Sequence, residues 1–144
     1  LALRNENASL RNHMREAVLA ACDLSSVDGD GKFVIVDGWN LILGAKRTAK
    51  NLEDLIAQMK LRLEERADDF IWIILDGPRE KTTLLPRMRI TYTGGEGVQR
   101  ADKMICDYLR MANLAGKISK VEVLTRDKKL ISEIEKIRVR TGRK

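Results

Sequence analysis

The sequence predicts an α/β domain with a mainly parallel central sheet, and three observations lead to that prediction. Strand-like and helix-like segments alternate from residue 32 onward. Two of the strands are continuous apolar runs, as expected for strands that are buried on both faces of a parallel sheet. The helical segments are roughly ten or more residues long, which suits right-handed parallel crossovers. These features predict a three-layer α/β/α domain with helices on both faces of the sheet.

The first part of the domain contains two predicted strands and one helix. Residues 32–37 form an apolar run that ends at Asp37, and residues 70–75 form the second run. Between them, residues 51–67 carry apolar side chains at helical spacing, with charged residues on the other face. We therefore expect a strand, a helix and a strand in this order.

The second part is predicted to contain a loop, a strand, a helix, a strand and a helix. Prolines mark the ends of a loop over residues 77–86, and residues 88–92 alternate in the manner of a more exposed strand. We expect a helix over residues 98–115, a strand over residues 120–125 and a last helix over residues 128–137.

Further segments flank the domain, which covers residues 32–137. Residues 1–22 contain few helix breakers and a short heptad-like apolar stripe, which predicts an N-terminal helix. This helix either packs on its own domain or forms a short coiled coil with a second copy or a partner protein. Residues 23–31 are expected to form a turn-rich linker, and residues 138–144 a basic tail.

The composition is that of an ordinary soluble protein of one domain. The chain has 144 residues, of which 44% are hydrophobic and 33% charged. No apolar run approaches the roughly 20 residues that a membrane-spanning helix needs. The charged N-terminal segment does not resemble a secretory signal. Cys22 and Cys106 lack metal-ligand spacing, so we expect buried, reduced thiols in a cytoplasmic protein.

Four aspartates mark the candidate site. Asp37 ends the first strand in FVIVDGWN, Asp76 ends the second in FIWIILDG, and Asp127 follows the last in VEVLTRD. Asp102 lies at the start of a predicted helix, in RADKMICDYL. Parallel strands deliver their carboxyl ends to one edge of the sheet, where sites in α/β domains form. We therefore expect these four acids to converge.

Converging carboxylates resist joint ionisation, and a divalent cation relieves that conflict. Mg²⁺ or Mn²⁺, bound by carboxylates, waters and a phosphate oxygen, is the expected cofactor. A net charge of +6 around an acidic site suits a polyanionic substrate, although the same charge also fits simple solubility. Each aspartate alone also fits a turn or a helix N-cap, and Asp76 in IILDGP is the least secure of the four.

The segments FVIVDGWNLI, IILDG, GGEGVQRAD and VLTRD, in this order, resemble the NYN branch of the PIN-like nuclease superfamily, and its YacP-like group in particular. The resemblance covers residues 32 to about 137. It implies a PIN-like, Rossmann-like fold and a metal-dependent ribonuclease, expected to be an endonuclease, that hydrolyses RNA phosphodiesters. The alternatives are a catalytically weak or inactive RNA-binding module and a structure-specific DNA nuclease.

The resemblance also implies which residues are catalytic. The family's metal-binding acids match the four aspartates, its DG-x-N amide matches an asparagine, and a hydroxyl position near the last acid matches a threonine. An amide at the DG-x-N position would orient the first acid or a metal-bound water. The matched residues are Asp37, Asp76, Asp102, Asp127, Asn40 and Thr125.

The expected RNA contacts are basic or aromatic residues near the site. Arg100 occupies the position of the family's threonine, where it would contact phosphate, whereas Glu96 is displaced from the family's position. Trp39 offers a face for base stacking, or packs against the helix that follows it. Other cations near the expected edge could follow the RNA backbone. They are Lys46, Arg47, Lys50, Arg79, Lys81, Arg87, Arg89 and Arg126.

Overall fold

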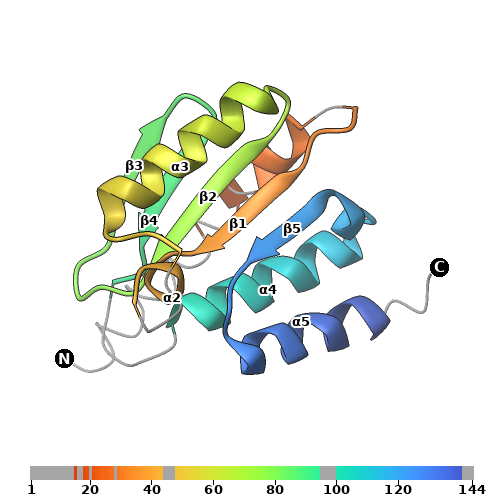
Figure 1. The fold of residues 1–144 in the computed structure, drawn as a ribbon. Helices are drawn as coiled ribbons and strands as arrows, with labels where there is room; N and C mark the ends of the chain where they lie inside the picture. Colours follow the sequence, from red (N-terminus) through yellow and green to blue (C-terminus); the bar gives the residue numbers. More distant parts are fainter. Residues whose placement is uncertain are drawn as a thin grey trace.

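A computed structural model of the chain shows a central sheet with helices on both of its faces (Figure 1). The structure describes residues 15, 18, 19, 21–27, 29–43, 48–94 and 100–140.

Within these residues the sheet has five strands, β1 (Phe33–Asp37), β2 (Phe70–Leu75), β3 (Lys81–Leu85), β4 (Met88–Tyr92) and β5 (Val121–Leu124). Their spatial order is β3-β4-β2-β1-β5. Strands β4, β2, β1 and β5 are parallel, and β3 pairs with β4 in the antiparallel direction at one edge. The prediction of an α/β fold with a mainly parallel sheet is confirmed.

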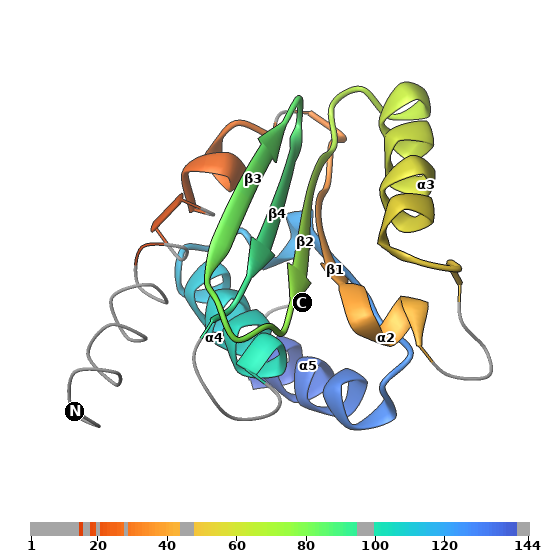
Figure 2. The same cartoon turned by 90° about the vertical axis from the view of Figure 1, so that its left-hand side faces the viewer.

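The helices form a layer on each face of the sheet. They are α2 (Gly38–Ile42), α3 (Leu52–Glu65), α4 (Arg100–Leu114) and α5 (Lys128–Arg140), with a short 3-10 helix, η1 (Ile118–Lys120). Helices α2 and α3 cover one face, and α4 and α5 cover the other (Figure 2). None of the helices in the described part of the chain has both the length and the apolar character needed to cross a bilayer.

Strand β1 contributes to two hydrophobic cores because each of its residues is buried. Phe33 and Ile35 point into a core shared with α4 and α5. Val34 and Val36 point to the opposite face, into a core shared with α2 and α3. This is the two-sided burial that a continuous apolar run predicts for a central parallel strand.

Residues 21–25 are helical and pack on the same face as α4 and α5. Leu24 and Val27 are buried in that core, and Asp23 forms a 2.6 Å ion pair with Arg89 of β4. Arg89 is 5% exposed, so the prediction that it follows an RNA backbone is wrong. Most of the predicted helix over residues 1–22 lies outside the described residues.

Among the free cysteines, Cys106 is buried as expected, whereas Cys22 is exposed.

The predicted loop over residues 77–86 is wrong in part, because Lys81–Leu85 forms strand β3. The prediction that β4 is a more exposed strand is also wrong, because β3 pairs with it along the edge of the sheet. β4 lies between β3 and β2, and four of its five residues are buried. The sheet therefore has one more strand than the sequence predicts.

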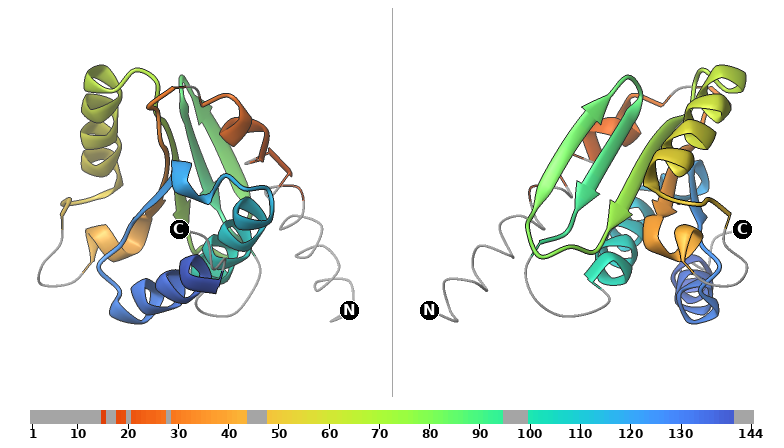
Figure 3. Two further views of the ribbon diagram at one scale, coloured as in Figure 1. Left: turned by 90° about the vertical axis from the view of Figure 1, so that its right-hand side faces the viewer. Right: turned by 60° about the vertical axis from the view of Figure 1, so that its left-hand side comes forward.

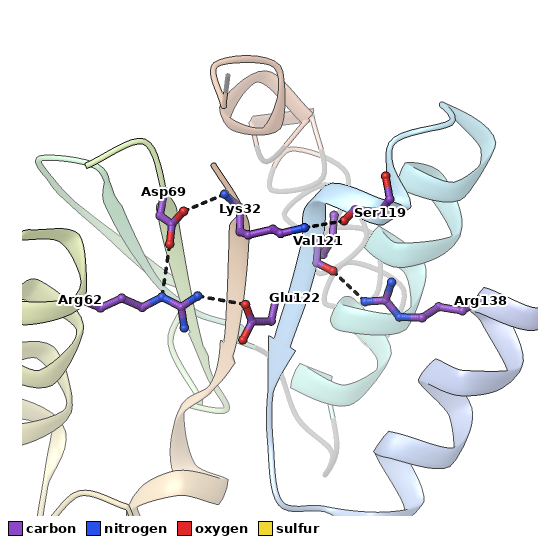
Figure 4. Close-up of polar contacts among 7 residues, drawn as sticks. All are labelled: Lys32, Arg62, Asp69, Ser119, Val121, Glu122 and Arg138. Carbon is purple, nitrogen blue, oxygen red and sulfur yellow. Dashed lines mark hydrogen bonds and ion pairs between the residues drawn. The ribbon is translucent and has the colours of Figure 1, made fainter. Parts of the chain in front are cut away.

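A polar network joins the amino-terminal ends of neighbouring strands (Figure 4). Asp69 is only 2% exposed. Its carboxylate accepts hydrogen bonds from the backbone N–H of Lys32 (2.8 Å) and from Nε of Arg62 (3.3 Å). Arg62 also donates from Nη2 to Glu122 of β5 (2.9 Å). The starts of β1 and β2, together with β5, are thereby tied to α3 at the end of the sheet opposite the candidate site.

Candidate functional site at the carboxyl edge of the sheet

The topology brings the four predicted aspartates to one edge of the sheet. Asp37 is the last residue of β1, Asp76 follows β2, and Asp127 lies between β5 and α5. Asp102 is in the first turn of α4. The carboxyl ends of β1 and β2 lie at the same end of the molecule as the first turns of α4 and α5 (Figure 3). The edge is therefore acidic as a consequence of parallel pairing.

Asp37 is the most perturbed of these acids. Its side chain is buried at 7% residue exposure, and this burial is the largest cause that raises its pKa to about 6. The hydrogen bond from Thr125 lowers the pKa, whereas the charges of Asp102, Asp127 and Asp76 raise it further. The four carboxylates are therefore close enough to interact electrostatically.

A hydroxyl and an amide connect the end of β1 with the end of β5. The Thr125 hydroxyl lies 2.9 Å from Oδ2 of Asp37 and 3.1 Å from Oδ1 of Asn40. Because it has a single hydrogen, it donates to one of them at a time. Oδ1 of Asn40 also accepts a short hydrogen bond from the backbone N–H of Arg126, and the N–H of Asp127 donates to Thr125. Thr125 therefore orients Asp37, and Asn40 holds the loop that carries Asp127 through the N–H of Arg126.

Asp76 and Asp127 each use one oxygen at the start of a helix. Oδ1 of Asp127 accepts from the backbone N–H groups of Lys129 (2.9 Å) and Leu130 (3.3 Å), so that Asp127 caps α5. Oδ1 of Asp76 accepts from the N–H of Ala101 in the first turn of α4 (2.8 Å). Both carboxylates are thus held in fixed orientations. Asp127 has the N-cap role that was the alternative interpretation of each aspartate, whereas Asp76 accepts from residues that are distant in the sequence.

Asp102 differs from the other acids in its surroundings. Burial is the largest cause that raises its pKa, followed by the charges of Asp127 and Asp76, and the charge of Lys129 lowers it. Within the described residues its carboxylate makes no hydrogen bond or ion pair. Asp102 is consequently the carboxylate of this edge that packing leaves most available to a ligand.

The predicted RNA contacts lie in different environments. Nε1 of Trp39 donates to the backbone oxygen of Asp76 (2.7 Å), and its partly buried ring packs on the α2 and α3 core. Of the two predicted roles of Trp39, base stacking or packing within the domain, the structure shows the packing. Arg79 is exposed in the loop after β2, and Arg100 is partly buried at the start of α4. Lys46, Arg47 and Glu96 lie outside the described residues.

Sequence reasoning missed residues that support the site through hydroxyl groups. Thr93 donates to Oδ1 of Asp76 (3.2 Å), and Thr48 accepts from Nε of Arg126 (3.2 Å). Neither threonine belongs to a recognisable motif, and Thr48 precedes β5 by more than seventy residues. Only the folded chain brings Thr48 and Arg126 together.

The chemistry of the donor set suits a hard cation such as Mg²⁺ or Mn²⁺, which prefers oxygen ligands. Burial is the largest cause that raises the pKa of Asp37, and the nearby acids raise it further, so a bound cation would favour its charged form. In the described parts of the chain, however, no group of three or more His, Cys, Asp or Glu side chains is close enough to hold a metal ion. The edge therefore has the chemistry of a metal site without a formed coordination shell.

Comparisons with family models, with curated proteins and with solved structures find no match for this chain. The function has to be inferred from the residues at this edge of the sheet.

Proposed function

We propose that this chain is a metal-dependent ribonuclease with a PIN-like fold of the NYN type, and that it hydrolyses RNA with Mg²⁺ or Mn²⁺ at the carboxyl edge of its sheet. The observation that supports this proposal is Asp37, a buried carboxylate whose pKa is raised to about 6 by burial and by three nearby acids. Such an arrangement disfavours the charged form of the acid, and strongly perturbed groups of this kind cluster at functional sites. A bound cation would compensate the free-energy cost of the charged form of Asp37.

Asp37, Asp102 and Asp127 would hold the ion, and Asp76 would complete the set. Asp127 and Asp76 each use Oδ1 at a helix start, so Oδ2 is the oxygen that each would offer. Since no three of these acids are grouped at ligand distance within the described residues, the proposal requires them to move closer when the ion binds. The ion would supply a Lewis acid and would lower the pKa of a bound water.

The remaining residues of the site would position the acids and the RNA. The hydroxyl of Thr125 would orient Asp37, which lowers the cost of ordering it as a ligand, and the side-chain oxygen of Asn40 would hold the backbone of the loop that carries Asp127. The net charge of +6 attracts a polyanion to the surface around the acidic edge. The proposed contacts with RNA are Trp39, Arg79, Arg100 and Arg126.

Cleavage of RNA by the Asp37→Asn variant tests the proposal most directly. The purified chain is incubated with end-labelled single-stranded and hairpin RNAs, with Mg²⁺ or Mn²⁺ and in EDTA. We expect metal-dependent cleavage by the wild type and a loss of about 100-fold in the variant, the upper end of the range for removing a partner of a metal ligand. Asp68→Asn is the matched control, because Asp68 is an exposed acid at the opposite end of the sheet. Equal rates for Asp37→Asn and Asp68→Asn would rule out this metal centre.

A second candidate function is an RNA-binding module without catalysis. It is favoured by the use of Asp76 and Asp127 as acceptors at helix starts and by the absence, among the described residues, of three acids grouped around one point. Binding of RNA without cleavage over a full titration of Mg²⁺ and Mn²⁺ would support this candidate over the nuclease.

A further inference from the structure

Arg126 lies beside the acidic edge, and the fold holds it there by its backbone and by its side chain. Its backbone N–H donates to Oδ1 of Asn40, the same oxygen that lies 3.1 Å from the Thr125 hydroxyl. Its Nε donates to Oγ1 of Thr48 (3.2 Å). The arginine therefore bridges the loop after β5 and the segment that precedes α3.

Thr48 is itself well anchored, so that it provides a fixed support for Arg126. Its backbone N–H donates to the carbonyl of Leu41 in α2 (2.7 Å). Its carbonyl accepts from Nε2 of Gln58 in α3 (3.0 Å). With both backbone groups bonded, the backbone of Thr48 has a defined position relative to α2, which carries Asn40.

The bond from Nε to a neutral hydroxyl leaves the charge of Arg126 uncompensated. Although four acids are gathered at this edge, Arg126 forms no ion pair with any described residue, and its terminal amino groups have no described hydrogen-bond partner. The side chain is exposed. A guanidinium that is fixed at Nε presents its two terminal nitrogens as a planar fork, which matches two oxygens of a phosphate.

We propose that Arg126 is a phosphate-binding residue that holds the RNA backbone beside the acidic edge, and that Thr48 is the positioning residue that aims its guanidinium. This inference rests on the proposed function, because it takes the ligand to be the phosphodiester backbone of RNA. Arg126 is next to Asp127 in the chain, but its guanidinium is directed to Thr48. The same short loop therefore supplies a carboxylate for the metal ion and a guanidinium for a phosphate.

Binding of RNA in EDTA, where metal-dependent cleavage is suppressed, tests Arg126 separately from catalysis. The dissociation constant of a fluorescein-labelled single-stranded RNA is measured by anisotropy over a range of KCl concentrations. We expect Arg126→Ala to weaken binding roughly tenfold, the scale of one hydrogen-bonded contact to a charged group. The slope of log K against log salt should fall by about 0.7, the value for one phosphate contact on a single strand.

Two further variants separate position from charge. Thr48→Val removes the acceptor of the Nε bond at similar volume, so we expect weaker binding, about threefold, with an unchanged salt slope because the charge remains. Arg126→Lys should keep most of the slope and lose affinity, since an ammonium cannot form the fork. Lys60→Ala, at an exposed position of α3, is the control for loss of one positive charge.

The outcomes distinguish this inference from the proposed function. If Arg126→Ala binds RNA with the affinity and salt slope of Lys60→Ala, the assignment of Arg126 is overturned, whether or not the wild type cleaves RNA. The assignment is also overturned if the wild type binds no RNA. If the wild type binds RNA but never cleaves it, and Arg126→Ala shows the expected loss, the nuclease proposal fails and the assignment of Arg126 stands.

Discussion

At Asp37, burial and three acidic neighbours disfavour the charged carboxylate, and the hydrogen bond from Thr125 only partly opposes them. Asparagine has the same shape as aspartate and can accept the same hydrogen bond without a charge. The charge at this position therefore has a cost in stability, and that cost can be measured.

In metal-free buffer we expect the stability of the wild type to fall as the pH rises from about 4 to about 6. The pKa of Asp37 is about 6 in the folded chain and 3.8 as its ordinary value, so the native state binds more protons than the unfolded state in this window. The loss is at most about 3 kcal/mol, from about two pKa units at 1.36 kcal/mol each. Urea unfolding in EDTA at several pH values measures it.

The matched variants are Asp37→Asn and Asp68→Asn. Asp37→Asn cannot ionise, so it should lack this component of the pH dependence and be more stable than the wild type at pH 7.5 in EDTA. The exposed Asp68 should give a variant with the pH profile of the wild type. If Asp37→Asn is instead less stable than the wild type at pH 7.5, the charged carboxylate of Asp37 stabilises the folded chain, which would contradict this prediction.

At the scale of the elements, Asp76 stabilises the first turn of α4 by accepting a hydrogen bond from the N–H of Ala101. Asp76→Ala removes the acceptor for the N–H of Ala101 and for the hydroxyl of Thr93, and we expect a loss of about 1–2 kcal/mol in the free energy of unfolding. Asp76→Asn keeps an acceptor oxygen and should lose much less. Chemical denaturation compares the two variants. Similar losses would mean that the charge of Asp76, rather than its oxygen, stabilises the start of α4.

The junction of β1 and α2 depends on Gly38. A Cβ atom at this position would overlap Cδ2 of the buried Leu75 side chain and would lie 3.1 Å from the carbonyl oxygen of Ile74, so Gly38→Ala forces Leu75 to shift beside the site. We expect a loss of about 1–3 kcal/mol in the free energy of unfolding, typical of overpacking, and slower cleavage of RNA if the proposed nuclease activity holds. The melting temperature and the cleavage rate are the measurements. A variant with the stability and activity of the wild type would contradict this packing.

Gly29→Ala is the control for Gly38→Ala. Gly29 has a φ of +56° and no neighbouring atom within 4 Å of the added Cβ, so the variant should lose about 1 kcal/mol of stability through backbone strain alone and keep whatever cleavage the wild type shows.

The missed strand β3 shows why the sequence did not predict the whole sheet. Leu85 pairs with Met88, so Pro86 and Arg87 form a two-residue turn between β3 and β4. Arg87 has a φ of +58°, a conformation that usually requires glycine or asparagine. The usual hairpin signal was therefore absent, and the prolines suggested a loop. Nε of Arg87 donates to the backbone oxygen of Asp69 (2.6 Å), a tertiary contact that helps to hold this turn.

At the scale of the whole molecule, the position of the acids was predictable and their individual contacts were not. Strand periodicity and parallel pairing are enough to bring Asp37, Asp76 and Asp127 to one edge. The caps made by Asp76 and Asp127, and the contact between Thr48 and Arg126, depend on how helices and loops pack against the sheet. No local pattern in the sequence encodes these distances.

The two ends of the sheet also differ in how their charges are balanced. At the amino-terminal end, Asp69 and Glu122 are paired with Arg62. At the carboxyl end, burial raises the pKa values of Asp37 and Asp102, and the neighbouring acids raise them further. The charge of Lys129 lowers the pKa of Asp102. The unbalanced end is the one that should respond to an added cation.

We therefore expect Mn²⁺ or Mg²⁺ to stabilise the whole domain. An ion that binds only the folded chain adds about 2.7 kcal/mol at 100 times its dissociation constant, which corresponds to a rise of about 5–10 °C in the melting temperature of a domain of this size. Thermal unfolding at pH 7.5 and constant ionic strength measures the rise, with KCl in place of the divalent salt as the reference. Asp37→Asn should abolish most of the rise and Asp68→Asn should retain it. If divalent ions stabilise all three proteins equally, they act on the general surface charge. If they stabilise none, the acids of this edge do not form a metal site, and RNA binding without hydrolysis becomes the function to test.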